Sequence, residues 1–525
     1  MIAKEQLVVS VAEPENTTDQ TRTSRSTPVS PARVLAIVGV LVALGFAVWL
    51  RFFRLADHIG GFHAYNEGFY VKLALDDANR SMFAWITNPL DVNNPPLYGA
   101  IVAFFYRFLQ PSVQVARAVS SVASLATMAV VWRLGEELFD RRTGIFAAIF
   151  LGLMPGVVLV SRNAQVDAVL VLCMMACILC WVLSGRRDDW RWAAAAGLAI
   201  GLGVLTKLPA VIIVPALAVW ESLRLRGIRW IVSWRVLAFS VVGASIGIPW
   251  FAMRLGGHAA GYLSSQSGIA STAAAFTNGL FNEMVIEPFW LFSAPALLAI
   301  ALGVVMMARD RKSGDLLVAL ELLSVLAFLL VFHFHTYYWL PATPLVALVA
   351  ARGFTMVPTS GPARAAQTAV LVMLLAAMSL CAVMLMSGQK WGAWSPQQLV
   401  PLVARGGVAV TMPESLWDNT YGPAAEIYLP HGTALRGATP PPPGTHTLLS
   451  LQAPDPAQPP AFLMQTSVRP VLFGFELSQT PPRTHFFRNG PWNVERVGPL
   501  WRFGLDERQV PSRWALYDVS NLLFQ

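Results

Sequence analysis

Long apolar segments dominate this chain, and short charged or proline-rich breaks separate them. A helix rises 1.5 Å per residue, so about 20 apolar residues cross a hydrocarbon core of about 30 Å. At that length scale the pattern predicts about eleven transmembrane helices. We place them at residues 34–50, 113–132, 143–161, 166–184, 192–206, 208–220, 236–252, 288–307, 316–332, 339–351 and 365–386.

Basic residues lie in every second loop between these segments. Clusters follow the second, fourth, sixth, eighth and tenth segments, and further arginines precede the first. Cytoplasmic loops of membrane proteins are enriched in Arg and Lys. The alternation therefore predicts a cytoplasmic N-terminus and, after an odd number of crossings, an external C-terminus. The residues concerned are Arg22, Arg25, Arg33, Arg133, Arg141, Arg142, Arg186, Arg187, Arg191, Arg224, Arg226, Arg229, Arg235, Arg309, Arg311, Lys312, Arg352 and Arg364.

One further apolar stretch, residues 97–108, is too short to cross, and Pro95 and Pro96 open it. Counting it as a span would move every later basic cluster to the wrong side of the membrane. We interpret it as an interfacial or re-entrant helix. It lies in an external segment, residues 51–112, that is long enough to hold a site.

The pattern changes after residue 388, where proline-rich breaks alternate with strand-like pieces such as 407–410 and 447–450. We therefore predict an all-α polytopic membrane protein with a C-terminal extracytoplasmic α/β or β-rich domain. The expected parts are a polar cytoplasmic tail at 1–33, a transmembrane domain at 34–387 with the long external loop at 51–112, and an extracytoplasmic soluble domain at 388–525.

Composition agrees with this assignment. Hydrophobic residues make up 55% of the chain and charged residues 13%, whereas a soluble globular protein has about 25% charged residues. An ordinary cytosolic enzyme is thereby excluded. The net charge of +8 is explained by the cytoplasmic loops, so it does not indicate nucleic acid binding. The four cysteines all lie in apolar runs and predict no disulfide framework.

Polar residues gather on the predicted external face. Charges near the hydrocarbon are costly, which makes them candidates for a functional site. Each also has a structural interpretation: Arg162 and Asp167 as a capping ion pair, Lys207 as an interfacial lysine, and the aromatic residues as an interfacial belt. The candidates are Tyr65, Asn66, Glu67, Tyr70, Asp91, Asn94, Tyr98, Arg162, Asp167, Lys207, His335, Tyr337 and Tyr338.

Cations beside carboxylates suit a reaction in which a phosphate leaves. The cations stabilise the developing negative charge, and a carboxylate takes a proton from the attacking group. A lipid-linked phosphate would keep its tail in the bilayer and present its head group at this depth. Lys207 and Arg162 are the expected phosphate ligands, with Tyr337 and Tyr338 beside them.

The ordered motifs resemble the GT-C superfamily of membrane glycosyltransferases, in the branch of the protein O-mannosyltransferases and the lipid A aminoarabinose transferase. The resemblance covers roughly residues 34–386. No single motif is specific, but their order and shared sidedness are similar to the family's. The matching segments are Asn66-Glu67, Pro95 to Tyr98, Arg162 with Asp167, Thr206 to Pro209, and Tyr337 to Pro341.

The resemblance implies transfer of one sugar, with inversion, from a polyprenyl-phosphate donor to an external acceptor. The family usually has Asp where this chain has Asn66, and that Asp is its expected base. An amide does not accept a proton at neutral pH. We therefore rank Glu67 first, Asp167 second and Asp91 third as the base. Tyr65, Tyr70, Asn94, Tyr98 and His335 are expected to line the pocket.

No cofactor is expected, and no metal either, because the first loop lacks an acidic pair next to Glu67. Expected partners are the lipid-linked sugar, membrane lipids and a lipid, glycan or protein acceptor, as in lipid A or protein glycosylation. Richness in Ala, Arg and Pro favours a bacterial plasma membrane, with undecaprenyl phosphate as carrier. The alternatives are a transporter or flippase of a lipid-linked or anionic substrate and a non-enzymatic scaffold. Transporters commonly show paired repeats and charges near mid-membrane, whereas here the charges lie at one face and the first external loop is long. The scaffold leaves the one-sided cluster of charge unexplained.

Overall fold

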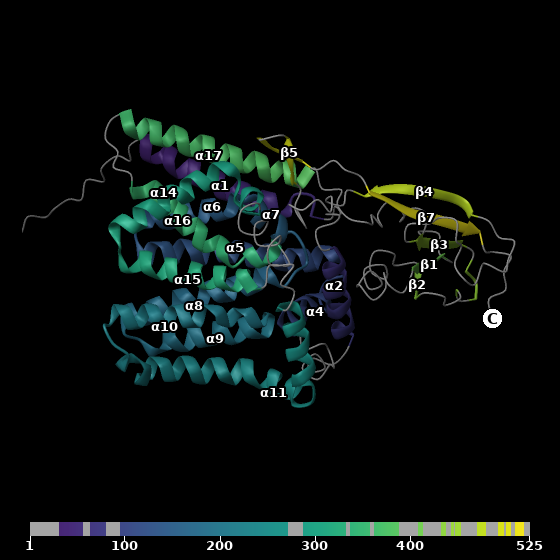
Figure 1. Ribbon diagram of the computed structural model, residues 1–525, viewed down its shortest axis with the longest axis horizontal. Coiled ribbons are helices and arrows are strands. Elements are labelled where there is room, and N and C mark those ends of the chain that lie inside the picture. Colours follow the sequence, from purple (N-terminus) through teal and green to yellow (C-terminus); the bar gives the residue numbers. More distant parts are fainter. Residues whose placement is uncertain are drawn as a thin grey trace, which may run out of the picture. The chain divides into compact units, whose positions relative to one another are not determined.

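The structure is a computed structural model of the 525-residue chain (Figure 1). It divides into two compact units, residues 1–42 and 43–525, and every contact discussed below lies within the second. The residues that the structure describes are 31–55, 64–79, 95–270, 287–331, 336–356, 362–387, 408–412, 432–436, 441, 443–445, 447–452, 470–478, 492–497, 500–505 and 510–518.

Helices account for nearly all of the described residues before position 388. They are α1 Pro31–Phe52, α2 Ala64–Ala78, α4 Leu97–Tyr106, α5 Val113–Leu138, α6 Arg141–Leu153, α7 Pro155–Ser161, α8 Asp167–Arg187, α9 Trp190–Thr206, η1 Leu208–Ile212, α10 Ile213–Arg224, η2 Arg229–Val232, α11 Trp234–Ala270, α13 Glu287–Phe292, α14 Ala294–Asp310, α15 Ser313–Val331, η4 Thr336–Trp339, α16 Ala342–Met356 and α17 Pro362–Ser387.

Each of the predicted spans falls on one or two of these helices, and residues 97–106 form the short helix α4. By length and apolarity, four described helices are able to cross a membrane, or five if α6 and α7, bent by 64° at Pro155, form one span. Several shorter apolar helices accompany them, among them α9 and α16. The larger predicted number of crossings and their direction remain predictions.

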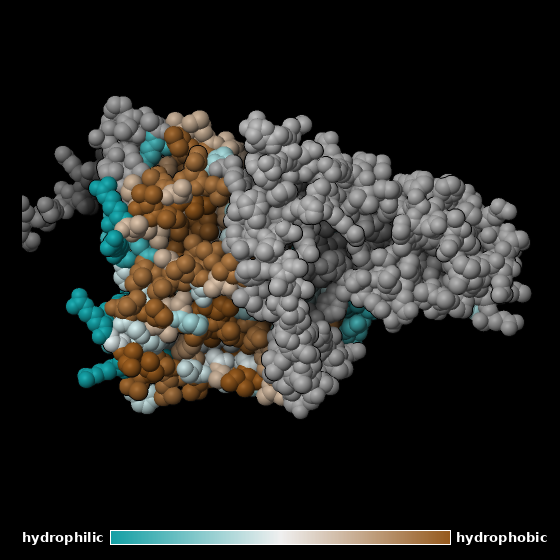
Figure 2. Space-filling view, viewed as in Figure 1, coloured by the Kyte–Doolittle hydropathy of each residue, from teal (hydrophilic) through white to brown (hydrophobic). Residues whose placement is uncertain are grey.

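Glycines allow the helices to approach closely where the chain is most apolar. A Cβ on Gly197 of α9 would lie 2.4 Å from the carbonyl oxygen of Phe239 in α11. One on Gly144 of α6 would lie 2.2 Å from the carbonyl oxygen of Trp132 in α5. Both distances are shorter than side-chain atoms tolerate, so backbone packs on backbone at these crossings. Figure 2 shows an apolar band over the helices, with hydrophilic side chains gathered at one end.

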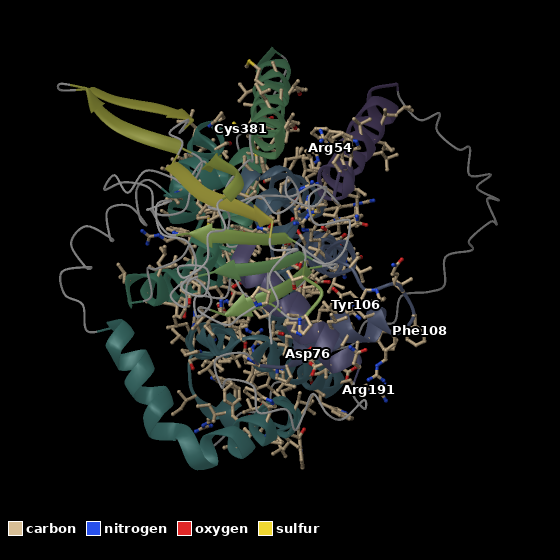
Figure 3. The ribbon with its side chains drawn as sticks, turned by 90° about the vertical axis from the view of Figure 1, so that its right-hand side faces the viewer. Arg54, Asp76, Tyr106, Phe108, Arg191 and Cys381 are labelled. Atoms are coloured by element: carbon tan, nitrogen blue, oxygen red, sulfur yellow. The ribbon has the colours of Figure 1, made fainter. Side chains whose placement is uncertain are left out.

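Two short helices, α2 and α4, pack against each other at one end of the long helices α5, α8 and α9 (Figure 1). The start of α5, the turn between α7 and α8, and Lys207 after α9 lie at this same end, which we call the site end. Figure 3 looks onto it and labels Arg54, Asp76 and Tyr106.

Strands follow in the C-terminal part. They are β1 Val408–Met412, β2 Gly432–Arg436, β3 Thr447–Gln452, β4 Pro470–Ser478, β5 Trp492–Val497, β6 Leu500–Leu505 and β7 Val510–Asp518. Five form a mixed sheet of order β2-β1-β3-β7-β4, with β1 parallel to β2 and β3 and with β7 antiparallel to β3 and β4. The two strand-like pieces of the sequence lie in or next to β1 and β3; the domain boundaries remain a prediction.

Candidate active site

Glu67 of α2 forms a buried ion pair with Arg117 of α5. The Arg117 Nε and Nη2 atoms donate to the two carboxylate oxygens at 2.8 and 2.6 Å, and the side chains are 2% and 1% exposed. The backbone N–H of Ala164 donates to the same carboxylate at 2.9 Å. A bidentate guanidinium fixes a carboxylate in orientation as well as in charge. Both Glu67 oxygens are therefore engaged, and α2, α5 and the α7–α8 turn are joined at one point.

Sequence reasoning missed Arg117, although it lies inside a predicted span, where a charge is costly and therefore informative. The Nη1 atom of Arg117 donates to the carbonyl of Leu55 at 2.9 Å, so the arginine also holds the chain that leaves α1. The α5 helix presents Arg117 one turn after its N-cap, Ser112, whose hydroxyl accepts from the N–H of Val115.

A second ion pair joins Asp167, the first residue of α8, to Lys207, which follows α9. The Lys207 Nζ donates to Asp167 Oδ1 at 3.0 Å, and the side chains are 17% and 4% exposed. The ammonium also lies 4.6 Å from the ring centre of Tyr338 in η4, a cation–π distance. Residues far apart in the sequence thus meet at the site end.

The charge of Lys207 is maintained by these neighbours. Burial alone lowers the pKa of an ammonium, but the Asp167 carboxylate and Tyr338 outweigh burial and raise the pKa of Lys207 above its ordinary value. Lys207 is therefore fully protonated at neutral pH. Because the pair uses Oδ1, the second oxygen, Oδ2, lies outside this bond.

Arg162 donates hydrogen bonds to the backbone at the end of α1. Its two terminal nitrogens donate to the carbonyls of Leu50 at 2.7 Å and Arg54 at 3.3 Å, at the end of α1. The sequence suggested a capping ion pair between Arg162 and Asp167. In the structure, Asp167 forms its ion pair with Lys207. Arg162 lies in the turn that also supplies the Ala164 N–H, so it belongs to the same region of the structure.

Tyrosines of α2 and α4 support this region from one side. Tyr98 is fully buried, and its hydroxyl lies 3.0 Å from the Ala116 carbonyl and 3.0 Å from Ser120 Oγ. Tyr70 is half-buried and contacts the Tyr98 ring edge-on at 5.6 Å. Burial raises the pKa of Tyr98 well above its ordinary value, so its hydroxyl is a fixed hydrogen-bonding group and not an acid.

Several predicted site residues are not tested by this geometry. Asp91, Asn94 and His335 lie outside the described residues, and the side chains of Tyr65, Asn66 and Tyr337 do as well. Among the residues that are described, no group of three His, Cys, Asp or Glu side chains is placed to hold a metal ion. The catalytic and binding roles expected for the site residues are treated below as proposals.

An apolar groove is lined in part by Leu208, the residue that follows Lys207. It has a volume of about 560 Å³ and lies between α9, η1, α10 and α11. Its lining is almost entirely hydrocarbon and includes Ile200, Val204, Leu208, Gly243, Ala244 and Phe251. In the sequence, the charged residue Lys207 therefore comes directly before a residue that lines the apolar groove.

Comparison with known families gives one match within the helical part. Residues 93–252 match the family model described as dolichyl-phosphate-mannose-protein mannosyltransferase. This range contains Arg117, Arg162, Asp167 and Lys207. A search of curated protein sequences finds no match.

Solved structures give matches over most of the chain. ArnT from Cupriavidus metallidurans in the apo state aligns with a TM-score of 0.60 and 15% identity, over 94% of this chain and 100% of ArnT. The same protein bound to undecaprenyl phosphate aligns with a TM-score of 0.55 and 14% identity, over 84% of this chain and 96% of ArnT. The apo oligosaccharyltransferase of Archaeoglobus fulgidus aligns with a TM-score of 0.55 and 12% identity, over 79% of this chain and 69% of the oligosaccharyltransferase.

The matched proteins are GT-C glycosyltransferases, and at these identities the structural matches establish the fold. The family match covers the segment that carries most of the described site residues. Together they confirm the resemblance drawn from the ordered motifs: the chain has the fold of the GT-C membrane glycosyltransferases that use polyprenyl-phosphate sugars.

Proposed function

We propose that this protein is an inverting glycosyltransferase that moves a single hexosyl or pentosyl group from a polyprenyl-phosphate donor to an acceptor at the outer face of a bacterial plasma membrane. The observation that carries the proposal is that a buried cation, Lys207, is followed in the chain by Leu208, which lines the apolar groove. A polyprenyl phosphate has the same two parts, an anionic head and a long hydrocarbon tail.

The groove fits the hydrocarbon part of such a donor. A soluble phosphate or nucleotide would gain nothing from an apolar lining, whereas each buried methylene of a prenyl chain contributes about 0.8 kcal/mol. Gly201 and Gly243, two of the glycines that bring α9 and α11 together, also lie in the groove lining. The tail then lies along the helices with its phosphate at Lys207.

Lys207 and Arg162 are the proposed ligands of the donor phosphate, with Tyr338 beside the ammonium. During transfer, a hydroxyl oxygen of the acceptor forms a bond to the anomeric carbon, and the bond from that carbon to the phosphate oxygen breaks. The polyprenyl phosphate leaves with the electron pair of the broken bond. Cations stabilise the negative charge that grows on it.

Two carboxylates are proposed to take the acceptor proton, and their surroundings differ. Glu67 is held at both oxygens by Arg117, so protonating it would break a buried bidentate pair. Asp167 gives only Oδ1 to Lys207. When the donor phosphate draws Lys207 to itself, Asp167 loses part of its counter-charge and becomes a better proton acceptor. The geometry thus favours Asp167 as base and Glu67 as the residue that positions the α7–α8 turn.

The test is release of polyprenyl phosphate by the purified protein from a panel of polyprenyl-phosphate sugars, with acceptor extract supplied. Asp167→Asn and Glu67→Gln are measured beside the parent. Consumption of one sugar by the parent, an inactive Asp167→Asn variant and residual activity in Glu67→Gln support the proposal with Asp167 as base. The reverse pattern makes Glu67 the base. If the parent consumes no donor, the glycosyltransferase proposal is wrong.

A further inference from the structure

Gln165 has a buried side chain whose amide is unused. It is 1% exposed, and neither Nε2 nor Oε1 has a hydrogen-bond partner among the residues that the structure describes. A glutamine amide offers two donors and an acceptor oxygen with two lone pairs. Most buried polar atoms in proteins are paired, because leaving one unpaired costs free energy. An amide left unpaired by the described part of the chain points to a partner other than those residues.

The position of Gln165 indicates what that partner is. The residue before it, Ala164, binds Glu67 through its N–H, and Asp167, two residues after it, binds Lys207. Gln165 thus stands in the turn that connects the two ion pairs of the proposed site. A sugar attached to a phosphate at Lys207 would have its ring near this turn.

The backbone of Gln165 is held at both of its polar groups by one hydroxyl. Its N–H donates to Ser120 Oγ at 3.2 Å, and its carbonyl lies 3.1 Å from the same oxygen as acceptor. Ser120 is in turn 3.0 Å from the buried Tyr98 hydroxyl. A residue whose main chain is fixed in this way presents its side chain with little loss of freedom on binding.

We propose that Gln165 determines sugar specificity by hydrogen bonding to adjacent hydroxyl groups on the donor's sugar ring. The proposal rests on the proposed function, since it assigns a role within the same site. An amide that donates from Nε2 and accepts at Oε1 matches a neighbouring pair of hydroxyls, each of which both donates and accepts. The favoured donor class is therefore a hexose or pentose with a free vicinal pair, in preference to its deoxy analogue.

The test uses Gln165→Leu, which keeps the volume and removes the amide, with Gln114→Leu as the matched control on the exposed start of α5. Purified proteins are compared for polyprenyl phosphate binding, for kcat/KM with the accepted donor, and for kcat/KM with the corresponding deoxy-sugar donors. We expect Gln165→Leu to bind polyprenyl phosphate normally and to lose about 10- to 100-fold in kcat/KM with the accepted donor.

Loss of discrimination is the decisive result. The parent and Gln114→Leu should prefer the full sugar over one deoxy analogue, whereas Gln165→Leu should use both at similar rates. Thermal stability should be unchanged or higher, because a buried unpaired amide has been removed; Gln165→Met provides the same comparison if Gln165→Leu does not fold. Unchanged kcat/KM and unchanged preference in an active variant would overturn the inference. A parent that binds polyprenyl phosphate but consumes no sugar donor would overturn the proposed function first, and the inference with it.

Discussion

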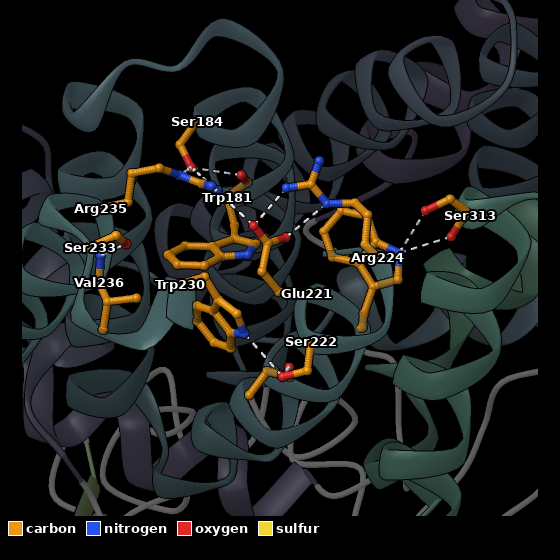
Figure 4. Close-up of polar contacts among 12 residues, drawn as sticks. Trp181, Ser184, Glu221, Ser222, Arg224, Trp230, Ser233, Arg235, Val236 and Ser313 are labelled. Carbon is orange, nitrogen blue, oxygen red and sulfur yellow. Dashed lines mark hydrogen bonds and ion pairs between the residues drawn. The ribbon is translucent and has the colours of Figure 1, made fainter. Parts of the chain in front are cut away.

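Two clusters of buried charge lie at opposite ends of α8, and they are built differently. At the site end, Asp167 pairs with Lys207 and Glu67 pairs with Arg117. At the far end, Glu221 of α10 accepts from two arginines: Arg224, whose Nε and Nη2 lie at 3.1 and 2.6 Å, and Arg235, at 3.0 Å (Figure 4).

The far cluster is closed by further contacts. Arg235 donates to Ser184 near the end of α8 at 2.9 and 3.1 Å and stacks on Trp181 at 4.9 Å. Figure 4 also shows the Trp230 indole bonded to Ser222. Helices α8, α10 and α11 are tied together here, and both oxygens of Glu221 are used. The Glu221 carboxylate is thereby satisfied by contacts within the protein.

The site end instead keeps unused capacity. Asp167 gives one oxygen to Lys207, the Gln165 amide has no partner among the described residues, and Leu208, which follows Lys207, lines an apolar groove. A buried polar network whose hydrogen bonds are all made holds helices rigidly together. A network with unpaired polar groups can bind a ligand that pairs with them. We therefore expect the Glu221 cluster to stabilise the fold and the Asp167 cluster to take part in the reaction. Substitutions in each cluster test these two roles.

The largest effect is expected for Asp167→Asn. It removes a proton acceptor and keeps the shape, so kcat per folded molecule should fall about 10²- to 10⁴-fold. Lys207 also loses its buried counter-charge, so the midpoint of thermal unfolding should fall as well, and activity is referred to the folded fraction. Single-turnover release of polyprenyl phosphate and thermal denaturation in detergent measure the two quantities. Full activity in this variant would move the base to Glu67.

Glu221→Gln should do the opposite. Two arginines would lose a carboxylate that is completely buried, which costs about 3 kcal/mol of stability, while activity per folded molecule stays that of the parent. Chemical denaturation in micelles and the specific activity of the folded fraction check this. A loss of activity without a loss of stability would contradict the assignment of this cluster to the fold.

Lys207→Ala should weaken donor binding by about 10- to 100-fold and slow turnover, because one charge holds the phosphate before and during transfer. Its matched control is Lys72→Ala on α2, where a half-exposed lysine pairs with Asp76 at 3.2 Å. Binding of polyprenyl phosphate measured for both variants separates the roles. Equal affinities would make Lys207 structural.

Ala244→Trp should fill the groove and reduce donor affinity about tenfold, through lost burial of the prenyl chain. Val241→Trp, at an exposed residue of α11 that does not belong to the groove lining, is the control. Short-chain donors should be affected less than long-chain ones. Identical affinities in the two variants would place the tail elsewhere.

The smallest effect is expected for pH. The raised pKa of Lys207 means that its proton is lost only when the pH rises above the ordinary lysine value of 10.5. Polyprenyl phosphate binding should therefore change less than about twofold between pH 7 and 9. A steep loss of binding in this range would show that another cation holds the phosphate.

Much of this protein follows from sequence alone. Apolar runs of the length of a bilayer predicted where helices lie, because hydrophobicity acts locally along the chain. Glu67, Asp167 and Lys207 were recognisable because charges near apolar segments are costly. The ordered motifs were enough to indicate the GT-C fold, which the comparisons confirm.

The tertiary structure decided which charged and polar side chains pair with each other. Asp167 lies five residues from Arg162 and forty from Lys207, yet its ion pair is with Lys207, because α8 and α9 bring their ends together. Arg117 and the unused Gln165 amide were equally hidden, since whether a polar group is paired depends on helices distant in the sequence. The sequence determined which charged and polar side chains lie next to the apolar segments. Only the packing of the helices decided which of these side chains are hydrogen-bonded within the protein and which are unpaired among the described residues.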